Sequence, residues 1–132
     1  MALSTIEAGD ARPRGHILLV DDDQATCLAL SQILRKAGYD VTSAIGFQTA
    51  LEVLETTQPL DLLVADLVMP DGINGIALSR MARLRRRNLK VLYLSGYDVP
   101  GAEHEALGPI LRKPIDGALL IEQVELALAA AA

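Results

Sequence analysis

Five short aliphatic segments recur along the chain, and each is followed by a longer segment with the spacing of an amphipathic helix. The aliphatic segments occupy residues 16–20, 41–44, 60–65, 90–94 and 109–111. The first reads HILLV and lacks polar alternate positions after its first residue, which is typical of a strand buried on both faces. A five-fold strand–helix alternation predicts an α/β fold in which helices cover both sides of a parallel sheet.

Capping and turn residues bound the helical segments between these strands. The segments occupy residues 24–37, 47–57, 76–87, 101–107 and 116–130, and residues 101–107 have room for only about two turns. Asp23 is expected to cap the first helix, and Gly38 is expected to end it. The apolar spacing predicts these inward-facing side chains: Leu28, Ala29, Ile33 and Leu34; Phe47, Ala50, Leu51 and Leu54; Leu119, Leu120, Val124 and Leu128.

The composition of the chain argues against several classes of protein. Its 132 residues suit a single domain, and no apolar run approaches the roughly 18 residues of a membrane span. The net charge of −5 and the presence of only four aromatic residues argue against a nucleic-acid binder. Because Cys27 is the single cysteine, no internal disulfide forms, and a cytoplasmic location is expected. The arginines at 80–87 are interpreted as a solvated helix end, with contact to an acidic partner as the alternative.

Polar residues follow four of the predicted strands at the points where these strands end. Asp21 and Asp22 follow the first strand, Asp66 the third, Ser95 the fourth and Lys113 the fifth. The carboxyl ends of parallel strands share one edge of a sheet, and ligands bind there. Three carboxylates at one edge repel one another unless a counter-charge is near, and such oxygen ligands suit Mg²⁺, with Mn²⁺ as the alternative. A divalent cation, a lysine and a hydroxyl around one carboxylate are the groups that phosphoryl transfer needs.

Four motifs lie in the order found in one known family. They are ILLVDDD at 17–23, LLVADLVMP at 62–70, VLYLSG at 91–96 and LRKP at 111–114. With these motifs, residues 15–129 resemble a response-regulator receiver domain of two-component signalling, with tails at 1–14 and 130–132. The resemblance implies a flavodoxin-like, doubly wound (βα)5 sandwich of three layers, whose five parallel strands lie in the order 2-1-3-4-5. It also implies a cytoplasmic, bacterial signalling protein that is not an enzyme.

The resemblance also implies a role for each residue at the sheet edge. Asp66 would accept the phosphoryl group of a phosphohistidine, and Asp21 and Asp22 would hold Mg²⁺ together with Asp66 and the backbone carbonyl of Val68. The implied partners are a sensor histidine kinase or a phosphotransfer protein, and a downstream protein that the sequence does not identify. No contact with nucleic acid or membrane is expected, and the expected state is a monomer or weak dimer.

Further roles are implied for the residues that follow the fourth and fifth strands. Ser95 would bond the phosphoryl group after transfer, Lys113 would pair with one of its oxygens, and Pro114 would orient the lysine. Tyr97 is interpreted either as a cover over the phosphoryl group or as an exposed loop residue.

The chain departs from the receiver pattern at three places. Ile110 stands three residues before Lys113, where the family usually has a tyrosine or phenylalanine that turns inward on activation. Because residues 96–112 are fewer than usual between Ser95 and Lys113, the fourth helix is expected to be short or irregular. Residues 70–75 form a turn that is one residue longer than the common pattern. The short fourth helix and the sequence SGYD at 95–98 resemble receivers of hybrid histidine kinases more than chemotaxis-type receivers.

Three alternatives stay open. The chain could be a receiver-like docking module that binds partners without phosphorylation, or a receiver fragment of a larger hybrid histidine kinase or regulator. A phosphohydrolase of the haloacid-dehalogenase type would also use an aspartyl phosphate. That reaction needs a second aspartate two residues after the nucleophile, and this chain has Val68 there.

Overall fold

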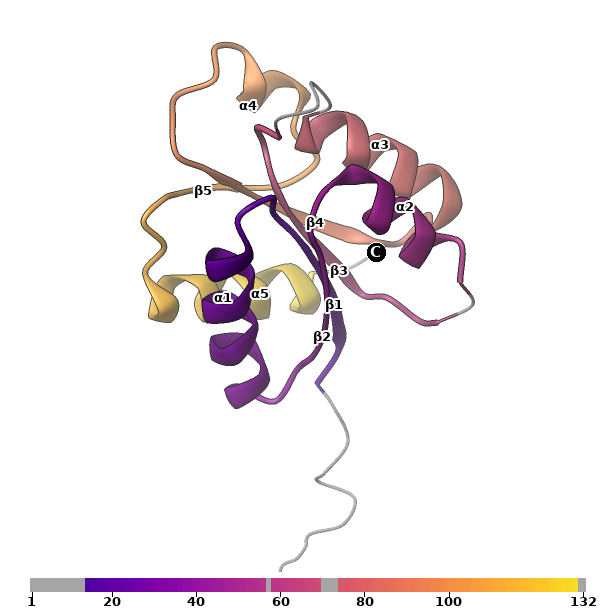
Figure 1. Ribbon diagram of the computed structural model, residues 1–132, viewed down its shortest axis with the longest axis vertical. Helices are drawn as coiled ribbons and strands as arrows, with labels where there is room; N and C mark the ends of the chain where they lie inside the picture. The colour runs from indigo at the N-terminus through magenta and orange to yellow at the C-terminus, as the bar shows by residue number, and fades with distance from the viewer. Residues whose placement is uncertain (1–13, 57, 70–73, 131–132) are drawn as a thin grey trace, which may run out of the picture.

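The computed structural model describes residues 14–56, 58–69 and 74–130, and these residues form three layers (Figure 1). The elements in chain order are β1 (His16–Val20), α1 (Gln24–Lys36), β2 (Asp40–Ala44), α2 (Phe47–Leu54), β3 (Leu62–Asp66), α3 (Gly75–Arg85), β4 (Lys90–Ser95), α4 (Ala102–Glu105), β5 (Ile110–Arg112) and α5 (Gly117–Ala129). The strands form one parallel sheet in the order β2-β1-β3-β4-β5. Helices α1 and α5 cover one face, and α2 and α3 cover the other (Figure 1). The predicted doubly wound fold and its strand order are confirmed.

The third and fourth strands end later than predicted. β3 includes Asp66, which pairs in register with Leu94 of β4. β4 continues to Ser95, which pairs with Arg112 of β5. Asp66 and Ser95 are therefore the last residues of two adjacent strands rather than the first residues of the loops that follow.

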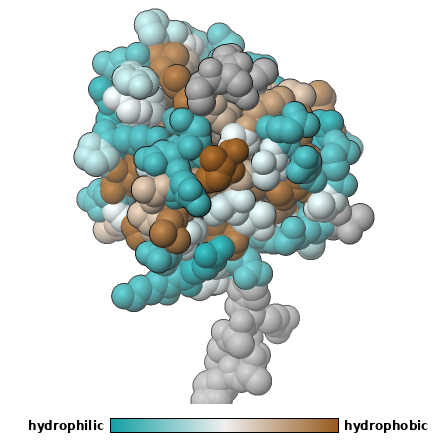
Figure 2. All heavy atoms as spheres, viewed as in Figure 1, coloured by the Kyte–Doolittle hydropathy of each residue, from teal (hydrophilic) through white to brown (hydrophobic). Residues whose placement is uncertain are grey.

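Each central strand contributes side chains to a separate core on either face of the sheet. In β1, Ile17 and Leu19 pack on the side of α1 and α5, whereas Leu18 and Val20 pack on the side of α2 and α3. All four side chains are fully buried, which explains why this strand has no polar alternate positions. Figure 2 shows the outer surface in the same view as Figure 1, where hydrophobic residues lie in small groups among hydrophilic ones.

The rotation of two helices about their axes differs from the prediction. The prediction that Leu28, Ala29 and Leu119 face inward is wrong, because all three are exposed, Leu28 at 58% and Leu119 at 41%. The other predicted inward positions of α1, α2 and α5 are buried or partly buried. Apolar spacing selects neighbouring positions on a helix, but packing against the sheet decides which of them face it. The residues that α1 buries are Cys27, Leu30, Ser31 and Leu34.

Helix α1 begins at its predicted cap. The Oδ1 atom of Asp23 accepts the backbone N–H of Ala25 at 3.2 Å, and its Oδ2 atom accepts the hydroxyl of Thr26 at 2.7 Å. The hydrogen bond from Thr26 lowers the pKa of Asp23 below its ordinary value, so the cap stays ionised at neutral pH. The backbone N–H of Asp23 donates to Asp21 Oδ1 at 2.9 Å, which links the start of α1 to the aspartate at the edge of the sheet.

A buried tyrosine anchors the segment that follows the fourth helix. α4 is a single turn of four residues, which confirms the predicted short fourth helix. The hydroxyl of Tyr93 in β4 accepts the backbone N–H of Leu107 at 3.0 Å and lies 2.6 Å from the Oγ atom of Ser79 on α3. At Gly108, an added Cβ would overlap the carbonyl oxygen of Val91, so this backbone packs directly against β4. Tyr93 therefore joins α3, β4 and the segment before β5.

Replacing Tyr93 with phenylalanine is expected to lower the free energy of unfolding by about 1–3 kcal/mol. The ring still fills the core, but Ser79 and Leu107 each lose a buried hydrogen-bond partner. Urea unfolding followed by circular dichroism measures the change. Tyr97→Phe is the matched control, because Tyr97 is 63% exposed, and it should leave the stability unchanged. Equal stability of the two variants would contradict the anchoring role of Tyr93.

Cys27 lies in the core between α1 and the sheet. It is 2% exposed, and its Sγ atom lies 3.6 Å from the carbonyl oxygen of Asp21. Burial, together with the Asp21 carboxylate, raises the pKa of the Cys27 thiol to about 11. Because the thiolate is the nucleophile, we expect iodoacetamide to leave the folded protein unmodified at about pH 8 and to alkylate it in urea. Intact mass spectrometry measures the adduct, and rapid alkylation of the folded protein would contradict this prediction.

Several predictions fall wholly or partly outside the described residues. They concern most of the tails at 1–14 and 130–132, residue 57 at the end of the second helix, and most of the turn at 70–75. Arg14 is described, and its backbone N–H donates to the carbonyl of Gly38 at 2.9 Å. Its guanidinium pairs with Glu125 at 3.0 Å and lies 4.8 Å from the centre of the Tyr39 ring. Within the described ranges, every helix is too short or too polar to span a lipid bilayer.

Candidate functional site

The parallel sheet brings the polar residues that end its strands to one edge. Asp21 follows β1, Asp66 ends β3, Ser95 ends β4 and Lys113 follows β5. β1 and β3 are neighbours in the sheet although β2 lies between them in sequence, so the strand order reverses at this point. Crevices at such reversals are the usual ligand sites of doubly wound folds.

Lys113 connects two carboxylates at this edge. Its Nζ atom lies 2.8 Å from Asp21 Oδ2 and 3.3 Å from Asp66 Oδ2. Asp21 is fully buried and Asp66 is 5% exposed, while the side chain of Lys113 is 24% exposed. Asp21 and Lys113 are 92 residues apart in sequence, so only the tertiary fold forms this pair.

Burial and neighbouring charges shift the protonation of both partners. Burial and the Asp21 charge raise the pKa of Asp66 above its ordinary value, and the Lys113 charge opposes this shift only in part. Burial acts to lower the pKa of Lys113, but the hydrogen bond to Asp21 and the charges of Asp21 and Asp66 outweigh it and raise that pKa. Lys113 is therefore a permanent cation beside a carboxyl group whose ionisation the fold disfavours.

Three carboxylates meet beside this lysine. Asp21, Asp22 and Asp66 each offer one oxygen atom, and these atoms lie within 4.8 Å of one another. When all three are ionised, Lys113 cancels one of three negative charges and two remain. Clustered oxygen donors with two uncompensated negative charges fit a divalent cation.

The acidic cluster lines a pocket of about 330 Å³ that also includes Val68, Gly96 and Tyr97. The backbone N–H of Val68 donates to Asp66 Oδ1 at 3.3 Å, which holds the Asp66 side chain in place. The side chains of Val68 and Tyr97 are exposed at 42% and 63%. Tyr97 is therefore a largely exposed loop residue at the rim of the pocket, and its role as a cover over a phosphoryl group stays a prediction.

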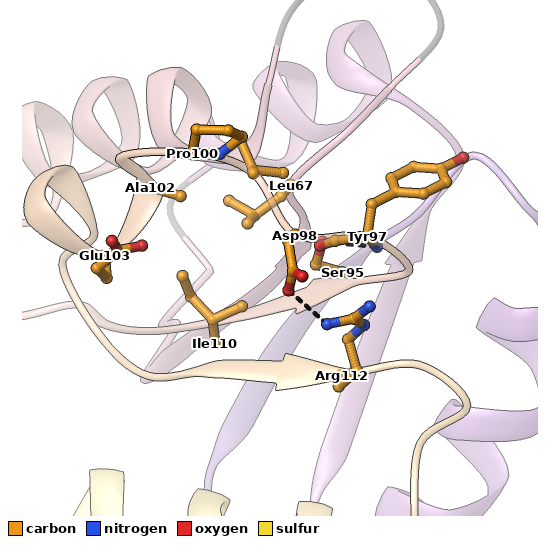
Figure 3. A pocket seen from close by; sticks show the side chains of 10 residues that line it. Leu67, Ser95, Tyr97, Asp98, Pro100, Ala102, Glu103, Ile110 and Arg112 are labelled. Atoms are coloured by element: carbon orange, nitrogen blue, oxygen red, sulfur yellow. Dashed lines mark hydrogen bonds and ion pairs between the residues drawn. The ribbon is translucent and has the colours of Figure 1, made fainter.

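Ser95 lies at the same edge, but its hydroxyl bonds within its own loop. The Oγ atom donates to the carbonyl oxygen of Tyr97 at 2.5 Å and accepts the Tyr97 N–H at 3.3 Å. Figure 3 shows the two residues side by side at the end of β4. Among the described residues, therefore, the structure brings Asp21, Asp22, Asp66 and Lys113 together but directs Ser95 toward its loop.

A second pocket, of about 450 Å³, is lined by Ser95 and Ile110 (Figure 3). Ile110 is partly buried and packs against the cluster that contains Leu67 and Ala102. An ion pair of 2.6 Å between Arg112 and Asp98 lines the same pocket. The aliphatic side chain at position 110 therefore lies partly against the core and partly at the wall of this pocket.

Backbone contacts fix the position of Lys113. Its N–H donates to the carbonyl oxygen of Ser95 at 2.8 Å, which continues the pairing of β4 with β5 by one residue. The Lys113–Pro114 peptide bond is cis. Pro114 therefore lies where the chain leaves the sheet, directly after the lysine.

Gly75 is a residue of the site that sequence reasoning missed. It is the first residue of α3, and a Cβ at this position would overlap the backbone carbonyl oxygen of Asp66. Its N–H donates to the carbonyl oxygen of Leu67 at 3.0 Å. Only glycine allows α3 to begin this close to the end of β3. The density of turn residues before α3 was the one signal of this close approach in the sequence.

Comparison with known proteins gives a consistent match. The family described as "Response regulator receiver domain" matches residues 17–125. The "Response regulator receiver protein CpdR" of Brucella abortus is 34% identical over 120 residues, which are 88% of this chain and 98% of CpdR. A response regulator receiver protein from Sinorhizobium medicae has a solved structure with 30% identity and a TM-score of 0.81, covering 88% of this chain and 95% of that one.

Two further solved structures are informative. The receiver domain of the hybrid histidine kinase CckA is 35% identical, with a TM-score of 0.73 and coverage of 86% and 99%. The response regulator TrrA of Thermotoga maritima, in complex with Mg(2+)-BeF, is 26% identical, with a TM-score of 0.75 and the same coverage. By contrast, the chain spans only 21% and 19% of the Arabidopsis thaliana response regulators ARR10 and ARR12, which are 39% and 37% identical to it. The likeness to these plant proteins is confined to about one fifth of their length.

Proposed function

Because this chain belongs to the response-regulator receiver family, we propose that Asp66 accepts a phosphoryl group from a phosphohistidine on a sensor kinase or phosphotransfer protein. The observation that carries the proposal is the position of the Lys113 ammonium, 3.3 Å from Asp66 and 2.8 Å from Asp21 within the acidic pocket. A downstream protein would then read the change that phosphorylation makes at the surface.

In the proposed transfer, one oxygen of the Asp66 carboxylate attacks phosphorus. The P–N bond to the donor histidine breaks, its electron pair leaves with the imidazole, and an aspartyl phosphate forms. Charge spreads over the three phosphoryl oxygens during this step. Lys113 would stabilise that charge, since its ammonium already lies beside Asp66. Its positive charge also favours the ionised, nucleophilic form of Asp66 against the effect of burial.

Asp21, Asp22 and Asp66, with the backbone carbonyl of Val68, would hold Mg²⁺, and Mn²⁺ is the alternative ion. A bound divalent cation neutralises charge on phosphoryl oxygens. The two uncompensated negative charges of the cluster and the likeness to TrrA, whose structure contains Mg(2+)-BeF, support this assignment.

Ser95 would bind the phosphoryl group once it is in place. Its hydroxyl now donates to the Tyr97 carbonyl, so that bond must break before it donates elsewhere. The loop that carries Tyr97 would therefore lose one of its two hydrogen bonds to Ser95. Pro114 is proposed to orient Lys113, because it directly follows the lysine at the end of β5.

Incubation with acetyl phosphate and Mg²⁺ is expected to add one phosphoryl group to the protein, measured by intact mass. Because the carboxylates repel the anionic donor unless a cation is bound, an excess of EDTA should abolish the adduct, and Mn²⁺ should restore it. An equal adduct with and without EDTA would contradict the role of the acidic cluster, and no adduct under any of these conditions would contradict the phosphoacceptor.

We propose a phosphoacceptor rather than a phosphomonoesterase, since the general acid of the haloacid-dehalogenase reaction would have to stand at Val68. A cytoplasmic location remains a prediction, and so does the monomeric or weakly dimeric state.

Docking without phosphorylation is the second candidate function. It is favoured by Ile110, because an isoleucine cannot make the inward turn of an aromatic ring that accompanies activation in the family. Equal affinity of an isolated partner for the wild-type protein and for Asp66→Asn, with acetyl phosphate present, would support this alternative over the phosphorylation switch.

A further inference from the structure

The arginines at the end of α3 have different partners. Arg85 forms an ion pair of 2.6 Å with Glu55. Arg86 donates to the backbone carbonyls of Gln58 at 2.5 Å and Thr56 at 2.7 Å. These two side chains tie α3 to the segment between α2 and β3. Arg85 and Arg86 therefore stabilise the fold. Arg80 and Arg83, which lie earlier on α3, have different surroundings.

Arg80 and Arg83 line a separate hollow on the outer side of α3. The hollow measures about 280 Å³, and Leu84 and Leu107 complete its lining. Leu84 is 83% exposed, the largest exposure among the large hydrophobic side chains of the described residues. The Nε atom of Arg83 is enclosed, and within the described residues it has no hydrogen-bond partner. The hollow thus combines the largely exposed side chain of Leu84 and the partly buried side chain of Leu107 with two guanidinium groups.

Hydrogen bonds hold the residues around this hollow in place. The backbone N–H of Leu107 bonds to the buried hydroxyl of Tyr93, and Arg80 donates to the backbone carbonyl of Glu105 at 3.1 Å. Arg83 lies eight residues after Gly75, so it is about 12 Å along the helix axis from the end of α3 beside Asp66. The hollow is therefore a formed surface away from the phosphoacceptor.

The chemistry of the hollow selects its partner. Guanidinium groups bind carboxylates through paired N–H donors, and apolar side chains beside them favour a ligand that also carries an apolar group. The whole chain carries a net charge of −5, so this positive surface is a local exception that attracts an acidic partner. Nucleic-acid backbones need a row of cations rather than an apolar hollow between two arginines.

We propose that this hollow binds an acidic peptide segment of a partner protein. An apolar side chain of that segment packs against Leu84 and Leu107, and a neighbouring carboxylate accepts hydrogen bonds from Arg83 and Arg80. This contact does not depend on the proposed function of Asp66, because none of its residues belongs to the acidic pocket.

The test uses the full chain and a short fluorescein-labelled peptide in which glutamates flank one leucine, with fluorescence anisotropy as the readout. Arg83→Ala and Leu84→Ala are each expected to weaken binding about tenfold, since each removes one charged or apolar contact. Arg87→Ala is the matched control for charge, because Arg87 lies at the same helix end but lines a different pocket. Leu126→Ala is the matched control for an exposed leucine, and both controls should bind as the wild-type protein does.

Four results would overturn the proposal. The first is no binding of the peptide at low salt, and the second is equal weakening by Arg87→Ala and Arg83→Ala. The third is equal binding of a peptide with alanine in place of leucine, since this would leave only a non-specific charge effect. The fourth is displacement of the peptide by a single-stranded RNA or by anionic vesicles, with this displacement lost in the Arg83→Ala variant. That result would assign the surface to another class of partner. Far-UV circular dichroism and the acetyl phosphate adduct verify that each variant is folded.

Discussion

The Asp66→Asn variant is expected to take up no phosphoryl group under conditions that modify the wild-type protein. The amide has nearly the size of the carboxylate but no anionic oxygen to attack phosphorus. Intact mass after incubation with acetyl phosphate and Mg²⁺ measures the adduct. Asp40→Asn is the matched control, because Asp40 is an exposed aspartate at the start of β2, and it should keep the adduct. An equal adduct on Asp66→Asn would show that another residue accepts the phosphoryl group.

The same variant is expected to be more stable than the wild-type protein at neutral pH when no divalent cation is present. Burial and the Asp21 charge raise the pKa of Asp66 above its ordinary value of 3.8, so the folded protein disfavours its ionisation. Ionised Asp66 therefore lowers the stability as the pH rises above about 3.8, and asparagine removes this loss. Urea unfolding should show a gain at neutral pH that shrinks toward pH 4. Such a gain would also exclude unfolding as the reason for the missing adduct, whereas a loss of stability at neutral pH would contradict this electrostatic explanation.

The Lys113→Ala variant is expected to be phosphorylated at least about a hundredfold more slowly than the wild-type protein, because it lacks a fixed positive charge beside the reacting carboxylate. The fully buried Asp21 also loses its partner at 2.8 Å. Leaving a buried charge unpaired costs roughly 3–5 kcal/mol, and we expect a smaller loss of about 2 kcal/mol because Lys113 is partly exposed. The initial rate of adduct formation and urea unfolding measure the two effects.

Controls for Lys113 separate its charge from its shape. Lys36→Ala removes an exposed lysine from the end of α1 and should change neither the rate nor the stability. Lys113→Arg keeps the charge on a larger, planar group, so it should retain most of the stability but only part of the rate. A Lys113→Ala protein that is phosphorylated at the wild-type rate would contradict the proposed role of this residue.

The residues at the carboxyl edge of the sheet show what a sequence pattern can predict and what it cannot. Asp21, Asp66, Ser95 and Lys113 could be assigned to one edge without a structure, since parallel strands bring their carboxyl ends together. The pattern did not reveal that the Ser95 hydroxyl bonds to the Tyr97 carbonyl, because a hydroxyl rotates freely and its partner depends on the path of the loop. The position of a strand therefore follows from the sequence pattern, whereas the direction of a side chain depends on the local path of the backbone.

The rotation of a helix about its own axis is likewise not predicted by the sequence pattern. The spacing of apolar residues correctly predicts helices at α1 and α5, yet Leu28 and Leu119 are exposed. On α1, neighbouring Cys27 and Leu30 are buried instead. Several adjacent positions satisfy the same helical period, and only contact with the sheet selects among them. Small side chains such as that of Cys27 carry little hydrophobic signal, although they fit best where a helix lies close to a strand.

The sequence by itself determined the alternation of strands and helices, the cap at Asp23 and the set of polar residues at the carboxyl edge of the sheet. These features depend on local periodicity, on single-residue preferences and on the rule that parallel strands share an edge. Only the tertiary structure decided that Gly75 must approach Asp66, that Lys113 pairs with Asp21, and that Leu84 and Leu107 form one hollow. The physical reason is that these contacts join residues distant along the chain, whose distances are set by packing of the whole core rather than by any local pattern.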